Sequence, residues 1–253
     1  MDYGSDLKVS FSILTHNETD SLRKLIKQLS SIKTIWDEII IVDDYSDNPE
    51  TNLILSWAID EKGAKVFRNK LNNDFAQQKN FANSKCSNEY IFNIDADELL
   101  DDTLAKTFKE ILNLNRDVEM YRLPRINKVS GITLKHIGEW GWQISKLDSE
   151  IEEKSISKTS DEYKLYKSYN LILFEDDKSD KIRFFTPIIN FPDLQGRIYK
   201  NNPNIKWVKP VHETLVGFKN YGTFPLKKEY CLLHDKEIKK QEIQNDFYSK
   251  IGK

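Results

Sequence analysis

The stretch Tyr90-Ile91-Phe92-Asn93-Ile94-Asp95-Ala96-Asp97-Glu98 is the most informative part of this chain. Its first five residues form a mostly apolar run, which is typical of a buried strand. Asp95 and Asp97 follow where that strand ends and a loop begins. Carboxylate oxygens are ligands that Mg²⁺ and Mn²⁺ prefer, and such ions commonly bridge a carboxylate to the phosphates of a substrate. The stretch predicts a metal-assisted site for a phosphorylated substrate, and the alternative is an ordinary acidic loop.

Strand and helix patterns alternate on both sides of this stretch. The predicted strands are Val9–Leu14, Glu38–Val42, Ala64–Phe67, Tyr90–Ile94 and Met120–Leu123. The predicted helices are Thr19–Ser31, Pro49–Lys62, Phe75–Ser84 and a helix that Asp101–Thr103 can cap and that runs to about Leu114. This alternation predicts an α/β fold, with a mostly parallel central sheet and helices on both faces.

Polar residues follow three of the predicted strands. They are Thr15–Glu18 after the first strand, Asp43 and Asp44 after the second, and Asp95–Glu98 after the fourth. Ligands of such sheets bind beyond the carboxyl ends of the strands, so these side chains are expected at one edge. The alternative is that they only form turns, since Asn and Asp favour turns.

Composition limits the classes of protein that need to be considered. The chain has 253 residues, of which 39% are hydrophobic and 31% charged, and its net charge of −2 does not favour nucleic acid binding. Cys86 and Cys231 lie far apart in the sequence, which indicates a reducing compartment and free thiols, and the alternative is one disulfide. The polar segment Met1–Lys8 does not resemble a signal peptide, and no apolar run approaches the ~20 residues of a membrane span. We therefore expect a cytoplasmic protein.

Four motifs in the first half resemble those of family 2 glycosyltransferases with the GT-A fold, in particular the lipopolysaccharide-core β-glycosyltransferase subgroup. The motifs are Ile13–Glu18, Trp36–Asp47, Gln77–Ala82 and Asp95–Glu98. In the second half, Phe191–Lys200 is similar to the subgroup's Pro-Asp-x-Gln-x-Arg-Leu-Phe stretch, Val211–Glu213 matches its Val-His-Glu, and Leu233-His234 resembles a later histidine. The resemblance covers most of the chain except Gly141 to Thr186.

The resemblance implies a single GT-A domain over residues 1–253. Residues 1–125 would bind the nucleotide sugar, residues 126–235 would serve the acceptor and catalysis, and residues 236–253 would form a C-terminal helix. Thr15, Asn17 and Glu18 would lie against the nucleotide, and Asp44 would bind its base or ribose beside Asp43. Gln78 and Lys79 would approach the nucleotide or its phosphates, Asp95 would sit near the ribose and metal, and Asp97 would be the direct ligand of Mn²⁺ or Mg²⁺.

Inverting transfer requires a base that deprotonates the acceptor hydroxyl. Glu213 is the candidate, and the alternatives for it are a surface position or a structural pairing with Arg197. Asp193 is the rival base. His212 and His234 could contact the diphosphate or complete the metal shell, because neutral imidazole also binds Mn²⁺. Arg197 could bind phosphate or pair with a carboxylate of the fold.

A charged insert at about residues 145–186 departs from the subgroup's pattern. Ser149–Tyr166 is expected to be a helix or a mobile insert, and Leu171–Phe174 an added strand. The run Lys236–Lys250 has apolar residues at helical spacing and is expected to be a helix with a solvated face. A peripheral membrane contact stays open, although mixed charges argue against strong binding to anionic lipid.

The sequence therefore predicts a metal-dependent, inverting glycosyltransferase. Its partners would be a nucleotide-sugar donor, with UDP as the expected nucleotide, and a glycan or lipid-linked saccharide as acceptor. One alternative is a nucleotidyltransferase, which would need a glycine-rich loop near the first strand, whereas Thr15–Leu22 contains no glycine. The other alternative is a non-catalytic nucleotide-sugar binding protein.

Overall fold

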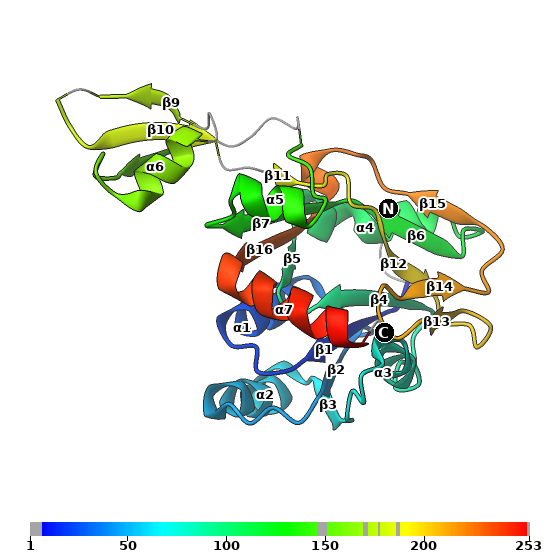
Figure 1. Cartoon of the computed structure of the whole chain (residues 1–253). Coiled ribbons are helices and arrows are strands. Elements are labelled where there is room, and N and C mark those ends of the chain that lie inside the picture. The colour runs from blue at the N-terminus through cyan, green and yellow to red at the C-terminus, as the bar shows by residue number, and fades with distance from the viewer. Residues whose placement is uncertain (1–6, 146–150, 169–171, 177, 186–187, 252–253) are drawn as a thin grey trace. The chain divides into compact units, whose positions relative to one another are not determined.

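The computed structural model describes residues 7–145, 151–168, 172–176, 178–185 and 188–251 (Figure 1). The chain forms two compact units. Unit 1 comprises Met1–Pro124, Leu194–Leu233 and Asp246–Lys253, and unit 2 comprises Arg125–Asp193 and His234–Asn245.

Unit 1 is built on a seven-stranded sheet. The strand order is β15 (Tyr221–Thr223), β6 (Met120–Leu123), β12 (Gln195–Lys200), β4 (Tyr90–Asp95), β1 (Val9–Thr15), β2 (Glu38–Asp43) and β3 (Lys65–Arg68). The strands from β4 to β3 run parallel to one another, whereas β12 is antiparallel to both of its neighbours. The mostly parallel sheet expected from the sequence is thus confirmed, with one strand inserted in the opposite direction.

The helices of the first half begin and end close to the predicted residues. They are α1 (Asp20–Ile32), α2 (Pro49–Lys62), α3 (Phe75–Asn83) and α4 (Asp102–Leu114). Helix α2 shows why the ends of these helices can be predicted from the sequence. The Asn48 side chain accepts a hydrogen bond from the Glu50 backbone N–H at 2.9 Å, Pro49 occupies the first turn, and Gly63 ends the helix at a φ of +65°.

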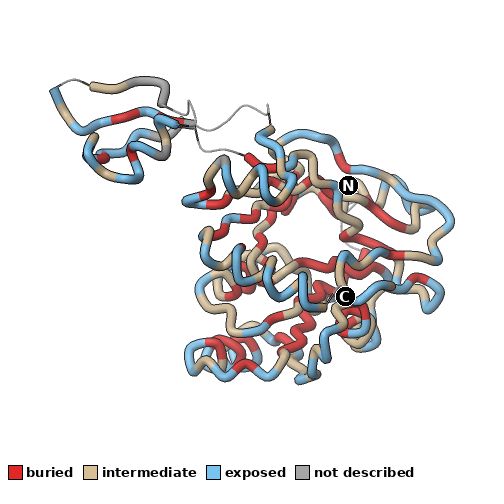
Figure 2. The backbone as a smooth tube through the Cα atoms, viewed as in Figure 1, coloured by how far each residue is buried: buried red, intermediate tan, exposed pale blue. Residues whose placement is uncertain are grey.

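Side chains on the two faces of the sheet enter different cores, because successive residues of a strand point in opposite directions. Phe92 belongs to the larger core, where its ring centroid lies 5.5 Å from that of Phe108 on α4. Its neighbour Ile91 belongs to a smaller core with Ala76 of α3 and Trp207. Figure 2 shows buried backbone along the strands of this sheet. Helix α3 therefore covers one face, and α1 and α4 contribute to the core on the other.

Shorter elements complete unit 1. They are β5 (Glu98–Leu100), directly after the acidic stretch, the antiparallel pair β13 (Lys206–Val208) and β14 (Thr214–Val216), and the 3₁₀ turn η1 (Lys228–Tyr230).

Unit 2 contains the insert. Its elements are β7 (Arg125–Ser130), α5 (Leu134–Glu139), β8 (Ile151–Ser155), α6 (Asp161–Ser168), β9 (Ile172–Glu175), β10 (Lys181–Phe185), β11 (Ile188–Ile189), most of β16 (Leu232–Glu237) and the start of α7 (Ile238–Ile251). Strand β7 lies between β11 and β16, while β10 lies between β8 and β9. The expected C-terminal helix is confirmed as α7.

The helix expected over Ser149–Tyr166 is confirmed only in its last part, where α6 begins at Asp161, whereas Ile151–Ser155 forms a strand. Residues from Ile151 form strand β8, which pairs antiparallel with β10, and Lys181 Nζ on β10 lies 3.1 Å from Glu153 Oε1 on β8. This partner lies far along the chain, so the local charge pattern does not reveal the strand. The added strand expected over Leu171–Phe174 is confirmed as β9, although Leu171 lies outside the described residues.

Candidate functional site

Three strand ends of unit 1 meet at one edge of the central sheet. Strand β1 lies between β2 and β4 and runs parallel to both. In this register Thr15 stands opposite Asp43, and Leu14 stands opposite Asp95. The polar residues that follow these strands therefore share an edge, as the sequence predicts.

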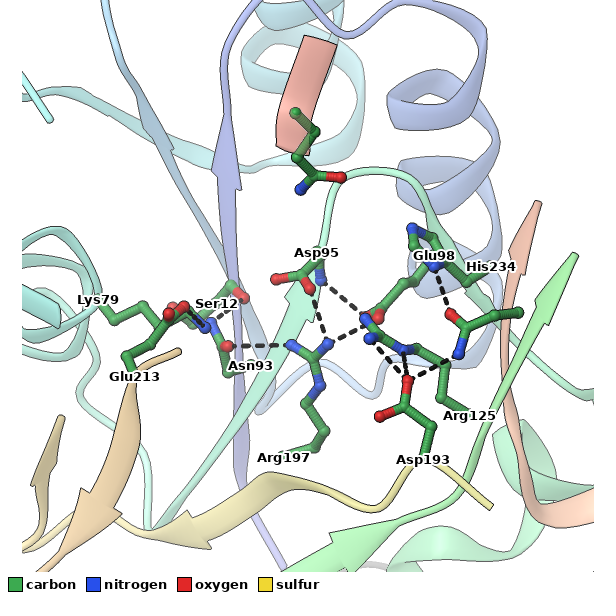
Figure 3. A network of polar contacts seen from close by, with 12 residues as sticks. Ser12, Lys79, Asn93, Asp95, Glu98, Arg125, Asp193, Arg197, Glu213 and His234 are labelled. Atoms are coloured by element: carbon green, nitrogen blue, oxygen red, sulfur yellow. Dashed lines mark hydrogen bonds and ion pairs between the residues drawn. The ribbon is translucent and has the colours of Figure 1, made fainter. Parts of the chain in front are cut away.

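The acidic stretch is held by a buried arginine from β12. Arg197 Nη2 lies 2.7 Å from Asp95 Oδ2 and 2.6 Å from Glu98 Oε1 (Figure 3). The side chains of Arg197 and Glu98 are 3% and 0% exposed, whereas that of Asp95 is 35% exposed. Glu98 also accepts a hydrogen bond from the Asp95 backbone N–H at 3.0 Å. These contacts fix the backbone on either side of the half-buried Asp97.

Arg197 thus pairs with carboxylates of the fold, the second of the two roles that the sequence left open. Burial alone would lower the pKa of Arg197, but Asp95 and Glu98 raise it above its ordinary value, and Glu213 adds to this effect. Arg197 therefore remains charged and balances part of the negative charge of the stretch. Its Nη1 also lies within hydrogen-bonding distance, 3.4 Å, of Asn93 Oδ1.

Asn17 joins the loop after β1 to the loop after β2. Its Oδ1 accepts hydrogen bonds from the backbone N–H groups of Asp47 and Asn48, both at 3.0 Å, and its Nδ2 donates to Asp47 Oδ1 at 2.8 Å. Its φ of +55° is one that Asn tolerates better than most residues. Asn17 thereby shapes the loops at the sheet edge.

Asp43 and Asp44 have different surroundings. Asp43 is fully buried, and its Oδ1 accepts a hydrogen bond from Ser46 Oγ at 2.6 Å, while Arg68 Nε lies 3.3 Å from its Oδ2. Asp44 is half-buried, and its Oδ1 accepts from the Leu71 backbone N–H at 2.9 Å. Asp43 therefore holds its own loop together, and Asp44 is the more accessible of the two.

Thr15 and Glu18 flank this edge. The Thr15 hydroxyl is buried and has no hydrogen-bond partner within the described parts of the chain. Glu18 Oε2 accepts a hydrogen bond from Ser21 Oγ at 2.8 Å, which ties it to the first turn of α1.

Helix α3 contributes Gln78 and Lys79, which are both buried. Two hydrogen bonds join Gln78 to Asn69. Asn69 Nδ2 donates to Gln78 Oε1 at 2.6 Å, and Gln78 Nε2 donates to the Asn69 carbonyl at 2.7 Å. Lys79 Nζ lies 2.6 Å from Glu213 Oε1 and 4.3 Å from the ring centroid of Trp207. The structure thus brings Lys79 to the candidate base, a contact that the sequence did not predict (Figure 3).

His212, next to Glu213, has an exposed side chain and a φ of +52°. The centroid of its ring lies 6.1 Å from that of Tyr248 on the last turns of α7.

The other two candidates, Asp193 and His234, belong to unit 2. Asp193 Oδ2 accepts hydrogen bonds from Arg125 Nε at 2.9 Å and from Asn127 Nδ2 at 2.7 Å. His234 Nδ1 lies 2.7 Å from Asn127 Oδ1. These residues form a polar network within unit 2.

A family model described as "Glycosyl transferase family 2" matches residues 10–181, more than half of the chain. The chain belongs to glycosyl transferase family 2. The match covers the loops after β1, β2 and β4, so the acidic stretch lies inside the family region.

Two relatives in this family match the chain in part. The lipopolysaccharide core biosynthesis glycosyltransferase LpsC of Rhizobium meliloti is 34% identical over 119 residues, which are 47% of this chain and 42% of LpsC. The uncharacterized glycosyltransferase RC0292 of Rickettsia conorii is 39% identical over 105 residues, 41% of this chain and 34% of the relative. The matches thus span less than half the length of either relative.

The fold is also similar to that of a solved structure. The crystal structure of S. aureus TarS 1-349 in complex with UDP-GlcNAc matches with a TM-score of 0.52 and 14% identity, over 90% of this chain and 58% of that one. The expected GT-A fold is thereby confirmed. Across the described residues, no helix combines the length and the apolar character needed to cross a membrane.

The residues of the acidic stretch suit a hard divalent cation. Within the described ranges, no group of three or more His, Cys, Asp or Glu side chains is arranged to hold a metal. Mg²⁺, however, is usually bound by one or two carboxylates together with substrate phosphates, not by a complete protein cage. Asp97 and Asp95, both half-buried at a strand end, provide that donor set.

Several residues of this edge were missed in the sequence. Arg68, at the end of β3, contacts Asp43, and Trp207 contacts Lys79. Asn93 interrupts an otherwise apolar strand, and that interruption is a signal that could have been used.

Proposed function

We propose that this chain is a metal-dependent, inverting glycosyltransferase that transfers a sugar from a nucleoside diphosphate, with UDP as the nucleotide, to a hydroxyl group. The observation that carries the proposal is the acidic stretch at the end of β4, which shares the sheet edge with the loops after β1 and β2 in a family 2 chain.

In this proposal the nucleotide lies over that edge. Thr15, Glu18 and Asp44 contact it. Asn17 and Asp43 instead hold the loops that receive it, because Asn17 bonds to the second loop through both Oδ1 and Nδ2, and Asp43 is fully buried. Gln78 supports the same region through Asn69. Arg197 positions Asp95 and Glu98 and does not bind phosphate, since Nη2 is already shared by two carboxylates.

Asp97, with Asp95 beside it, would hold the divalent cation. When bound, such an ion acts as a Lewis acid that stabilises the negative charge developing on the departing diphosphate. Mn²⁺ and Mg²⁺ both suit the carboxylate donors. His212 and His234 remain predicted as additional contacts to the metal or the diphosphate.

Glu213 is the proposed base. Its carboxylate takes the proton of the acceptor hydroxyl, whose oxygen forms the new bond to the anomeric carbon as the bond to the diphosphate breaks. Glu213 is near enough to Arg197 to raise its pKa, which supports a position close to the acidic stretch. Asp193 is the rival base, and two donors, Arg125 Nε and Asn127 Nδ2, contact its Oδ2, whereas Lys79 Nζ contacts Oε1 of Glu213.

The acceptor is proposed to be a glycan or a lipid-linked saccharide. The likeness to LpsC, whose name refers to lipopolysaccharide core biosynthesis, supports a saccharide acceptor. A cytoplasmic location and a peripheral membrane contact remain predictions.

The test starts with thermal shift against UDP-glucose, UDP-galactose, UDP-N-acetylglucosamine and the matching GDP-sugars, with and without Mn²⁺. Binding to the folded state raises the apparent stability by mass action. We expect one UDP-sugar to stabilise the protein in the presence of Mn²⁺, and this donor is then tested for Mn²⁺-dependent release of UDP.

Asp97→Asn should abolish this release without changing the melting temperature. Asp60→Asn, which alters an exposed carboxylate on α2, serves as the matched control and should behave as the wild type. Full activity of Asp97→Asn would refute the metal assignment. Pyrophosphate exchange would favour a nucleotidyltransferase, and binding without turnover would favour a non-catalytic protein.

A further inference from the structure

We propose that Lys79 is a positioning residue for Glu213. The inference rests on the proposed function, in which Glu213 is the base. The family resemblance implied instead that Lys79 approaches the nucleotide or its phosphates, and the positioning role replaces that role.

The contact between the two side chains is short and shielded. Lys79 Nζ lies 2.6 Å from Glu213 Oε1, and the side chains are only 8% and 16% exposed. By contrast, the equally short pair of Lys154 and Glu162 is 52% and 44% exposed. A charge-assisted hydrogen bond between partly desolvated groups is stronger and less screened than one at the surface. The Lys79 pair can therefore hold a carboxylate in one place.

Trp207 fixes the direction of the lysine. The ammonium lies 4.3 Å from the centroid of its ring, a favourable cation–π distance. The ring is itself oriented, because Trp207 Nε1 donates a hydrogen bond to the Tyr199 hydroxyl at 3.0 Å, and that hydroxyl donates to Asn83 Oδ1 at 2.8 Å. Lys79 is thus held on one side by an aromatic ring and on the other by Glu213.

Helix α3 also holds the backbone that leads to Glu213. The Asn80 side chain donates to the carbonyl of Trp207 and accepts from its backbone N–H, both at 2.9 Å. The Phe75 backbone N–H donates to the Pro210 carbonyl at 2.9 Å. Lys209, between these two anchors, has a φ of +75°, and His212, directly before Glu213, has a φ of +52°. Such unusual conformations need support from outside the segment. Lys79 supplies a side-chain anchor at its end.

The same helix reaches the nucleotide side of the sheet. Gln78 is bonded to Asn69, and nearby Leu71 donates its backbone N–H to Asp44 Oδ1. Three consecutive residues of α3 therefore contact different parts of the proposed site. Gln78 bonds to Asn69, Lys79 to Glu213, and Asn80 to Trp207 of β13. Because α3 is held at all of these points, the buried Lys79 can orient the carboxylate of Glu213.

A positioning role and a phosphate-binding role predict different kinetics. If Lys79 orients Glu213, its loss lowers kcat and has no further effect once Glu213 is absent. If Lys79 binds the diphosphate, its loss raises KM for the donor whether or not Glu213 is present.

The experiment measures Mn²⁺-dependent hydrolysis of the stabilising UDP-sugar, in which water takes the place of the acceptor. The variants are Lys79→Met, Lys79→Arg, Glu213→Gln and the double variant Lys79→Met with Glu213→Gln. Lys85→Met is the matched control, because Lys85 also lies over aromatic rings, 4.6 Å from Phe81 and 5.4 Å from Phe67. Melting temperatures identify folded variants, and Lys79→Gln replaces Lys79→Met if the latter does not fold.

We expect Lys79→Met to lower kcat about 10- to 100-fold with KM for the donor nearly unchanged, since small displacements of catalytic groups cost rates of this order. Lys79→Arg should recover part of the loss, and the double variant should match Glu213→Gln. A raised donor KM with unchanged kcat, or an additive double variant, would overturn the inference while leaving the proposed function intact. Full activity of Glu213→Gln would instead remove the base assignment, and the inference with it.

Discussion

Replacement of Arg197 by Met should destabilise unit 1 strongly, because this buried side chain pairs with two carboxylates. A single nitrogen of Arg197, Nη2, lies 2.7 Å from Asp95 Oδ2 and 2.6 Å from Glu98 Oε1, and the Glu98 side chain is fully buried. A methionine fills a similar volume but removes the cation that contacts Glu98 Oε1 at 2.6 Å. The variant therefore tests the charge and not the packing.

The expected loss follows from the burial of the pair. Removing one partner of a buried ion pair costs about 3–5 kcal/mol, since the other charge stays desolvated. This is a large share of the ~5–15 kcal/mol by which most domains are stable. With a urea m-value of about 3 kcal/mol/M, the unfolding midpoint should fall by about 1–1.7 M.

The assay is urea unfolding at neutral pH, followed by tryptophan fluorescence. Arg116→Met is the matched control, because Arg116 lies 3.9 Å from Glu89 with side chains that are 46% and 44% exposed. This variant should lose less than about 1 kcal/mol. The double variant of Arg197→Met with Glu98→Gln should be more stable than Arg197→Met alone, since an amide needs no cation. Equal losses for Arg197→Met and Arg116→Met would refute the reasoning.

Two further predictions concern titratable groups. Burial raises the pKa of Glu38, but hydrogen bonds from Lys65 and two serines outweigh it and lower the pKa from 4.5 to about 2. The stability that Glu38 provides is thus present above pH 4.5 and lost as the pH falls toward 2. Glu38→Gln should lower the free energy of unfolding by about 1–2 kcal/mol at neutral pH and leave it unchanged near pH 2. Urea unfolding of both proteins over a series of pH values measures this difference. Burial also raises the pKa of Cys86 and of Cys231 to about 12. Both free thiols should react slowly with a disulfide reagent until the protein is unfolded, and rapid labelling of the native protein would contradict this.

Local sequence patterns predicted most of the first half, because its elements are defined by residues close in the chain. The bounds of α2 follow from Asn48, Pro49 and Gly63, and β2 follows from a β-branched run that begins at Ile39. The insert was different. Strand β8 depends on pairing with β10, and its charged residues carry no alternation that would reveal a strand.

The candidate site was predictable in position but not in its contacts. The strand ends could be placed together because parallel strands align their carboxyl ends. The pairings of Arg197 with Asp95 and of Lys79 with Glu213 join residues more than a hundred positions apart, and many other charged residues could have served equally well on sequence grounds. Only the antiparallel insertion of β12 and the packing of β13 against α3 select these partners.

The place of β12 in the sheet has a consequence for how the protein folds. Strand β12 pairs with β4 across a gap of about a hundred residues, and it carries Arg197 to the acidic stretch. During synthesis, one edge of β4 stays unpaired until residues near Lys200 have left the ribosome. Pairing between strands so far apart in the sequence is also slow. We therefore expect that a fragment ending before β12 does not fold independently and is prone to aggregation.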